Sequence, residues 1–194
     1  MLSAIIATHE SERSLVPTLA ALVPGAAAGL IAEVIVADAD STDATAEVAD
    51  IAGCRFMTSS APIGTRLLAA AASTRTPWLL FLRAGTVPQP GWIEATDRFI
   101  QDAELLEGAA RAAVFRQPGA TDLMRPGFAE LVSLLRVAFG GGPRPEQGLL
   151  IAKRFYETIG GHPESADGEM ALLRRVGRRR IAMLSPTATI RANT

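Results

Sequence analysis

The sequence predicts a single α/β domain with a mostly parallel, doubly wound central sheet. Short apolar runs bounded by turn residues recur along the chain, with helical patterns between them. This alternation is typical of βαβ units. In addition, the apolar run at 34–37 leads directly into an acidic turn at 38–43. A buried parallel strand that ends in this way places its carboxylates at the carboxyl edge of the sheet, where open α/β folds bind ligands.

The first half of the chain alternates strands and helices in a regular order. The expected strands are 2–7, 33–37, 55–58 and 77–82, and the expected helices are 14–22, 44–52 and 65–73. Pro17 is expected in the first turn of the first helix, where a missing N–H is tolerated, and Pro24-Gly25 is expected to end that helix.

The second half is less regular. The expected helical segments are 92–104, 127–139, 155–159 and 170–176, and the expected strands are 111–116, 147–152 and 180–184. The stretch at 140–145, GGGPRP, is a candidate mobile loop because it is rich in glycine and proline. The sequence contains no internal repeat and no low-complexity tail, so no second domain is expected.

Composition limits the class of protein. The 194 residues are enough for one well-buried core, and 48% of them are apolar. A formal net charge of −1 argues against a general nucleic-acid binder. Cys54 has no cysteine partner, which fits a reducing compartment. No run approaches the ~20 apolar residues of a transmembrane helix, and no signal peptide opens the chain, so a cytoplasmic location is expected. The richness in alanine and arginine indicates a GC-rich bacterial genome.

The acidic turn carries Asp38, Asp40 and Asp43 together with Ser41 and Thr42. A carboxylate at this edge accepts hydrogen bonds from hydroxyls, which suits ribose or a sugar better than phosphate. Neither the dinucleotide-binding glycine fingerprint nor a Walker lysine is present. The alternative is an ordinary βα turn in which Ser41 or Thr42 caps a helix and Asp43 favours its positive end.

Five segments, in order, resemble the inverting family-2 glycosyltransferases of GT-A fold. They are SAIIATHESERSL, EVIVADADSTDAT, PWLLFLRAGTVPQPGW, EQGLLIAKRFYETIGGHPES and DGEMALLRRVGRRRIAML. They resemble the family's opening strand and turn, its acidic turn, the strand that ends in Asp-x-Asp, its Gly-Gly-Phe turn, and its Glu-Asp helix with the final strand. The subgroup they resemble most is the short transferases called rSAM/selenodomain-associated. The resemblance spans nearly the whole chain.

The resemblance implies transfer of a sugar, with inversion, from a nucleotide-diphosphate donor to a hydroxyl acceptor. One domain, 1–194, would provide a nucleotide-binding half at 1–100 and an acceptor-side half at 101–194. The family holds Mg²⁺ or Mn²⁺ between the donor phosphates with its Asp-x-Asp carboxylates, and a separate carboxylate acts as base. The resemblance is also compatible with a location at the inner membrane surface and with a homodimer.

The resemblance also implies a set of donor contacts from the first turn, the acidic turn and two arginines. These residues are Thr8, His9, Glu10, Asp38, Asp40, Arg66 and Arg83. Ala39 stands where the family has its base-reading aspartate, so uracil specificity is not implied. The alternatives are an exposed loop histidine for His9 and a surface arginine for Arg66.

The family's Asp-x-Asp is replaced here by Arg83-Ala84-Gly85, so no metal ligand is assigned. In one interpretation Arg83 supplies positive charge to a diphosphate, because a guanidinium matches phosphate oxygens. In the other the site has decayed, and the chain is an inactive GT-A-fold protein that binds a ligand or a partner. A third and weaker hypothesis, another Rossmann-like nucleotide enzyme, is disfavoured by the missing glycine fingerprint.

Catalytic and acceptor-side residues are expected near the C-terminus. Glu169 aligns with the family's catalytic aspartate, and Asp167 is the second candidate; the alternative is a helix start with Asp167 as N-cap. Gly160, Gly161 and His162 match the Gly-Gly-Phe turn, or they form only a glycine turn after a short helix.

The one dense basic cluster follows these residues. It consists of Arg174, Arg175, Arg178, Arg179 and Arg180. Such a cluster could attract a diphosphate, an anionic acceptor or a membrane surface, and the alternative is a solvated helix end.

Overall fold

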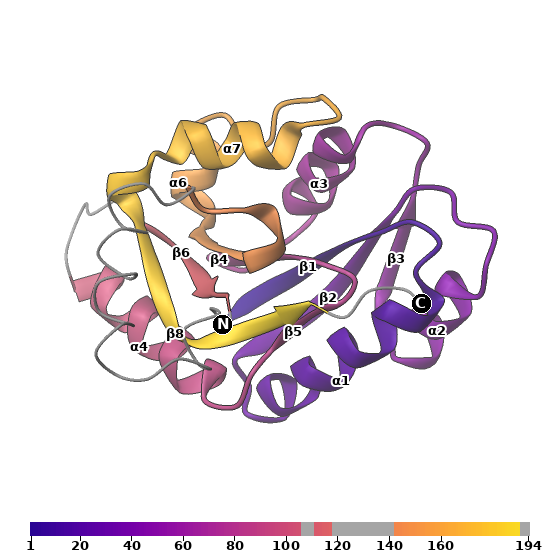
Figure 1. Ribbon diagram of the computed structural model, residues 1–194, viewed down its shortest axis with the longest axis horizontal. Coiled ribbons are helices and arrows are strands. Elements are labelled where there is room, and N and C mark those ends of the chain that lie inside the picture. The colour runs from indigo at the N-terminus through magenta and orange to yellow at the C-terminus, as the bar shows by residue number, and fades with distance from the viewer. Residues whose placement is uncertain (106–110, 118–141, 191–194) are drawn as a thin grey trace, which may run out of the picture.

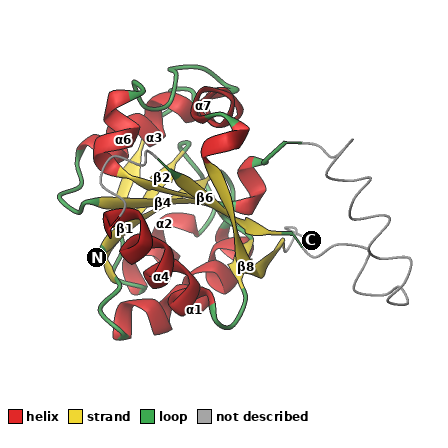
Figure 2. Ribbon diagram, turned by 90° about the vertical axis from the view of Figure 1, so that its left-hand side faces the viewer, coloured by secondary structure: helices red, strands yellow, loops and turns green. Residues whose placement is uncertain are grey.

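The computed structural model describes residues 1–105, 111–117 and 142–190. These residues form an eight-stranded sheet with helices on both of its faces (Figure 1 and Figure 2). Helices α3, α6 and α7 (Ile63–Ala72, Lys153–Thr158, Gly168–Val176) cover one face, and α1, α2 and α4 (Glu12–Ala27, Thr45–Ile51, Trp92–Leu105) cover the other.

The strands are β1 (Leu2–Thr8), β2 (Ile31–Asp38), β3 (Arg55–Thr58), β4 (Trp78–Arg83), β5 (Thr86–Pro88), β6 (Ala112–Arg116), β7 (Leu149–Ala152) and β8 (Ile181–Ile190). Two short 3₁₀ helices, η2 (Pro145–Gln147) and η3 (Arg178–Arg180), precede β7 and β8. The order across the sheet is β3-β2-β1-β4-β7-β6-β8-β5.

Most of the sheet is parallel, as the sequence predicts. β3, β2, β1 and β4 pair in parallel, and β6 pairs in parallel with β8. β7 lies antiparallel between β4 and β6, and β5 lies antiparallel to β8. The register places Thr8 opposite Asp38, Asp38 opposite Thr58, and Ala7 opposite Arg83. The last residues of four strands therefore line one edge of the sheet.

The core has one layer on each face of the sheet. Side chains alternate across a strand, so Ile6 and Leu80 pack under α1 and α4, whereas Ile5 and Leu79 pack under α3 and α7. β1 is buried along its whole length, because helices cover both of its faces. This double coverage explains why apolar residues occur on both faces of the strand, LSAIIAT, instead of alternating with exposed polar ones.

The first helix differs from the expectation. α1 runs from Glu12 to Ala27, so Pro17 lies beyond the first turn, and Pro24 and Gly25 lie inside the helix. The predicted stop at Pro24-Gly25 is therefore wrong. Each proline removes one backbone hydrogen bond, but the face of α1 around them is buried on the sheet. Gly25 is needed for packing, since a Cβ there would lie 2.5 Å from the indole of Trp92.

Smaller differences concern the second half. The strand at 111–116 is confirmed as β6, whereas β5 was not expected. The predicted strand at 147–152 starts at Leu149, because η2 forms first. The helix expected at 127–139 and the first two residues of the loop expected at 140–145 lie outside the described residues. No helix among the described residues is long and apolar enough to cross a bilayer.

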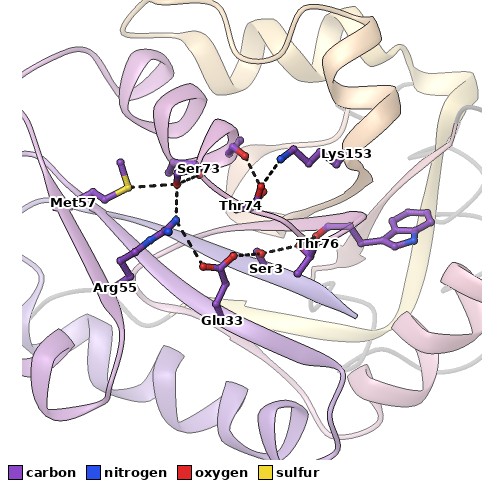
Figure 3. A network of polar contacts seen from close by, with 11 residues as sticks. Ser3, Glu33, Arg55, Met57, Ser73, Thr74, Thr76 and Lys153 are labelled. Carbon is purple, nitrogen blue, oxygen red and sulfur yellow. Dashed lines mark hydrogen bonds and ion pairs between the residues drawn. The ribbon is translucent and has the colours of Figure 1, made fainter.

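The amino edge of the sheet is closed by polar contacts (Figure 3). Ser3 Oγ on β1 donates to Glu33 Oε1 on β2 over 2.7 Å. Arg55 at the start of β3 lies 3.7 Å from Glu33 and donates to Ser73 Oγ at the end of α3. These contacts join β1, β2, β3 and the end of α3 at the amino edge, opposite the edge at which Thr8, Asp38, Thr58 and Arg83 end their strands.

Candidate functional site

Asp38 is fully buried at the end of β2. Its Oδ1 accepts hydrogen bonds from Thr8 Oγ1 (2.7 Å) and Ser41 Oγ (2.6 Å), and its Oδ2 accepts from the Ser41 N–H (2.7 Å). The structure thus brings together Thr8 and Asp38, two of the predicted donor contacts. The hydroxyls that Asp38 binds belong to the protein itself, so this carboxylate fixes the first turn against the acidic turn.

The two turns are also joined through Glu10. The Glu10 N–H donates to Ser41 Oγ (2.8 Å), and Glu10 Oε1 accepts from the Thr42 N–H (2.7 Å). Asp40 accepts a hydrogen bond from Thr58 Oγ1 (2.6 Å). Glu10 and Asp40 have φ angles of 47° and 52°, in the left-handed region that non-glycine residues seldom adopt. Strained residues of this kind gather at ligand sites. His9, between these groups and Thr8, is exposed.

Asp43 lies at the start of α2, as expected if the acidic turn were an ordinary βα turn. Its Oδ1 accepts from the Thr45 N–H (3.0 Å), and its Oδ2 accepts from the Glu12 N–H (3.0 Å). Burial raises the pKa of Asp43, but a hydrogen bond from the Thr45 hydroxyl and these two backbone hydrogen bonds outweigh it and leave the pKa below its ordinary value of 3.8. Asp43 therefore serves the first turns of both α1 and α2. The expectation that Ser41 or Thr42 caps α2 is wrong, because Ala44 is the N-cap residue.

Arg66, on α3, is not an unattached surface arginine. Its Nη1 donates to the carbonyl oxygens of Ala37 (2.5 Å) and Thr8 (3.3 Å), which lie at the ends of β2 and β1. Burial lowers the pKa of Arg66, and the charges of Asp38, Glu169 and Asp40 oppose that effect. A cation is therefore fixed at the strand ends, within the field of the predicted site carboxylates.

Arg83, at the end of β4, lies against Glu169 in the first turn of α7. Arg83 Nε donates to Glu169 Oε2 (3.0 Å) and Oε1 (3.2 Å), and Nη2 donates to Oε2 (2.5 Å). Arg83 Nη1 also contacts Glu146 Oε1 (3.2 Å). The hydrogen bonds that Arg83 donates to Glu169 raise the pKa of Arg83, although burial opposes them. The two residues predicted as phosphate contact and base thus form one ion pair.

Glu146 was not among the predicted site residues. It lies in η2, directly before β7. The signal available in the sequence was a carboxylate next to an apolar run in EQGLL. The resemblance gives that position no role, and only the folded chain places it beside Arg83.

Glycines at two helix starts bring α3 and α7 together. A Cβ on Gly64 would lie 1.8 Å from the Pro163 carbonyl oxygen, and one on Gly168 would lie 2.5 Å from the same atom. The Gly64 N–H donates to the Ser165 carbonyl (3.2 Å). This backbone-to-backbone approach places Arg66 and Glu169, in the first turns of their helices, at the same edge of the sheet.

The Gly160-Gly161 turn is anchored by His162. Both glycines have positive φ angles, 81° and 60°. His162 is buried, its Nδ1 lies 2.8 Å from the Tyr156 hydroxyl, and its ring packs edge-on against Phe81. Burial lowers the pKa of His162 to about 3. The imidazole is therefore neutral near pH 7 and packs in the core of this turn.

Asp167, the second catalytic candidate, is exposed at the N-cap position of α7. Its side chain makes no capping hydrogen bond. It accepts a hydrogen bond from Ser165 Oγ (2.9 Å) and lies 3.9 Å from Arg174. Of the two candidates, Glu169 is the one that contacts Arg83.

The residues present do not fit the metal that the resemblance implies. Arg83 stands where the first metal-binding carboxylate is expected, and a guanidinium repels a divalent cation. Gly85 stands at the second position with a φ of 91°, which disfavours any acidic side chain there. Glu169 and Glu146 both contact Arg83. No group of three metal-ligating side chains occurs within the described part of the chain.

Comparison with known proteins supports the family resemblance. The family model described as "Glycosyl transferase family 2" matches residues 3–136. No curated protein matches the chain.

Solved structures match the whole chain. Glucosyl-3-phosphoglycerate synthase from Mycobacterium tuberculosis, in complex with Mn²⁺, UDP and glucosyl-3-phosphoglycerate, has 20% identity and a TM-score of 0.68, over 100% of this chain and 73% of that one. The same enzyme in complex with Mn²⁺, UDP-glucose and phosphoglyceric acid has 20% identity and a TM-score of 0.67, and the match covers 100% of this chain and 72% of that one. A further match, described as a mycobacterial protein, has 20% identity and a TM-score of 0.67, and the match covers 100% of this chain and 68% of that one. These likenesses show the GT-A fold. Because the family model covers more than half of the sequence, the chain belongs to glycosyl transferase family 2.

Proposed function

We propose that this protein transfers a sugar from a nucleotide-diphosphate donor to a hydroxyl acceptor, with inversion at the anomeric carbon. The observation that carries the proposal is the Arg83–Glu169 pair at the carboxyl edge of the parallel strands. It combines, in one place, a cation for a diphosphate and a carboxylate for a hydroxyl proton. The family membership supports the same activity.

The nucleoside lies at the edge formed by the first turn and the acidic turn. Thr8, His9 and Glu10 form one side, and Asp38 and Asp40 form the other. The hydrogen bonds that join these turns keep the edge in a fixed shape, and a preorganised site loses less entropy on binding. The M. tuberculosis enzyme of the same fold binds UDP.

Arg83 supplies the positive charge that the donor diphosphate requires. A guanidinium presents its N–H groups in a fork that matches two phosphate oxygens. Arg83 already holds carboxylates in this geometry. Its charge stabilises the nucleoside diphosphate as that group leaves, and no step in this mechanism passes through a metal ion.

Glu169 acts as the general base. Its carboxylate takes the proton of the acceptor hydroxyl while the hydroxyl oxygen attacks the anomeric carbon from the side opposite the diphosphate. The new C–O bond forms as the bond to the diphosphate breaks, which inverts the anomeric centre. Diphosphate oxygens and Glu169 compete for the same guanidinium, so donor binding loosens the pair and exposes the base to the acceptor. The Gly160-Gly161 turn positions His162, which lines the small space beside Glu169, and Asp167 lies at the exposed start of the same helix as Glu169.

The test is a nucleotide screen by thermal shift, in EDTA and with added Mn²⁺. UDP, GDP, ADP and their glucose conjugates are compared, and at least one is expected to raise the melting temperature equally in both conditions. Arg83→Ala is expected to abolish the shift, while Arg98→Ala, an exposed change on α4, keeps it. Donor hydrolysis that is lost in Glu169→Gln would separate the transferase from the inactive alternative. If no nucleotide shifts the melting temperature in either condition, the proposal is wrong.

A further inference from the structure

A second hollow lies along α7, beyond Glu169. Its volume is about 420 Å³, and its walls include three arginines, Arg144, Arg174 and Arg178, over an apolar floor of Met170 and Leu173. Small-molecule sites commonly measure about 300–1,000 Å³ and combine an apolar lining with a few convergent polar groups. The hollow is therefore large enough for a ligand, unlike the space of about 10 Å³ directly beside Glu169.

The charge of this hollow is positive on two sides. Arg174 comes from the last turn of α7 and Arg178 from η3, whereas Arg144 precedes η2. No acidic residue is among those that line the hollow in the described part of the chain, and the exposed Asp167 lies 3.9 Å from Arg174 outside it. A Cβ on Gly142 would lie 3.1 Å from Arg178 Nε, so this glycine lets the opposite wall approach the guanidinium. Arginines that converge in this way select phosphate or carboxylate groups.

The hollow adjoins the small space beside Glu169. Leu173 lines both the arginine hollow and the small space beside Glu169. With a rise of about 1.5 Å per helical residue, the backbone of Arg174 lies roughly 7–8 Å along the axis from that of Glu169. A short molecule with an anion at one end and a hydroxyl at the other spans this distance.

The other arginines of the basic cluster do not extend this surface into a flat basic face. Arg175 donates to the carbonyl oxygens of Ile159 (3.0 Å) and Gly161 (3.2 Å). The Arg180 guanidinium lies over the ring of Phe155, 5.9 Å from its centre. The cluster is thus divided among separate contacts, which favours a small anion in the hollow over a membrane surface.

We propose that the arginine hollow is the acceptor site, and that the acceptor is a small hydroxylated molecule carrying a phosphate or carboxylate group. The anion binds Arg174 and Arg178, with Arg144 on the facing wall, and the hydroxyl reaches Glu169. The fate of the hydroxyl rests on the proposed function, but binding of the anion in the hollow does not.

Titration calorimetry at constant ionic strength tests this site with glycerol 3-phosphate, glycerate, inorganic phosphate and neutral glycerol. At least one of the two hydroxylated anions is expected to bind, and glycerol is not. The double variant Arg174→Gln/Arg178→Gln is expected to weaken that binding at least about tenfold, the equivalent of losing one charge-assisted hydrogen bond. Arg179→Gln, a neighbouring charge outside the hollow, keeps it. Melting temperatures of all variants show that they are folded.

Several outcomes overturn the proposal. The first is that neither glycerol 3-phosphate nor glycerate binds. The second is that the anion binds equally well to the double variant and to Arg179→Gln. Another is that these solutes fail while phosphatidylglycerol vesicles, but not phosphatidylcholine vesicles, bind through the same arginines, which would indicate a membrane contact.

Nucleotide binding separates this inference from the proposed function. The double variant is expected to retain the nucleotide-dependent rise in melting temperature. Arg83→Ala is expected to retain the binding of glycerol 3-phosphate or glycerate. Anion binding that depends on the hollow, without any nucleotide binding, would retain the site and refute the transferase. Nucleotide binding without anion binding would refute the anion site and leave the proposed transferase activity standing.

Discussion

The Arg83 guanidinium and the Glu169 carboxylate form a forked ion pair between the end of β4 and the first turn of α7. Arg83 Nε lies 3.0 Å from Glu169 Oε2, and Nη2 lies 2.5 Å from the same oxygen. The Glu169 side chain is 10% exposed and that of Arg83 is 41% exposed. A nearly buried carboxylate is therefore compensated by a cation that still reaches solvent.

Removal of Arg83 is expected to destabilise the fold through Glu169. In Arg83→Ala the carboxylate loses its charge-assisted hydrogen bonds, and we expect the free energy of unfolding to fall by about 1–3 kcal/mol. In the background of Glu169→Gln the same change should cost less, because no buried charge is left behind. Urea unfolding of the four proteins at pH 7 gives the coupling energy.

The matched control is Arg98→Ala on α4. Its effect on stability is expected to stay within about 0.5 kcal/mol, as for most surface changes. Additive effects of Arg83→Ala and Glu169→Gln would mean that the pair contributes no coupling in solution.

The strands were predictable where a mainly apolar run, or a short stretch such as Arg55–Thr58 between two helical patterns, is bounded by turn residues. β3 has the predicted bounds, and β4 is shifted by one residue. β5 was missed because three residues, Thr86–Pro88, carry no periodicity. The end of α1 was misjudged because Gly25 resembles a stop signal in the sequence, whereas its role depends on Trp92, far along the chain.

The candidate site was predictable only as far as sheet geometry determines it. Parallel register brings Thr8, Asp38 and Arg83 to one edge, and that much follows from strand order. The partners of these residues depend on tertiary packing. Thr8 and Ser41 occupy the Asp38 carboxylate, and Glu146 joins Arg83 from 63 residues away. No local pattern contains that information.

Gly64→Ala is expected to destabilise the protein more than its size suggests. The new methyl group would lie 1.8 Å from the Pro163 carbonyl oxygen, a backbone atom that cannot move without displacing the start of α7. Overpacking of this kind costs about 1–3 kcal/mol or more. Thermal and urea unfolding measure the loss, and weaker nucleotide binding should accompany it because Arg66 and Glu169 move apart.

Gly53→Ala serves as the comparison for this change. Gly53 has a φ of 70°, and a Cβ at this position would meet no atom within 4 Å, so alanine there suffers backbone strain without a clash. We expect a loss of about 1 kcal/mol, typical of the left-handed region. An equal or smaller loss in Gly64→Ala would show that α3 and α7 are less closely packed than described.

His162 is expected to make the fold sensitive to acid. Burial lowers its pKa from 6.5 to about 3 in the folded protein. The unfolded chain therefore binds a proton as the pH falls through 6.5, while the folded chain stays neutral at this site until about pH 3. Since protons bind the unfolded state first, acidification between these values lowers the free energy of unfolding.

Substitution of His162 by phenylalanine, the residue that the resemblance places at this position, removes that proton uptake. At pH 8 we expect His162→Phe to be less stable by about 1 kcal/mol, because the hydrogen bond to the Tyr156 hydroxyl is lost. Its stability should then fall less steeply than that of the original protein as the pH is lowered from about 6.5 to about 4, measured by urea unfolding at closely spaced pH values. Tyr156→Phe is the control: it removes the same hydrogen bond but keeps the buried imidazole, so the steep decline should remain. If the free energy of unfolding fell equally steeply with pH in His162→Phe and in the original protein, the imidazole would be already protonated, or exposed to water, in the folded state.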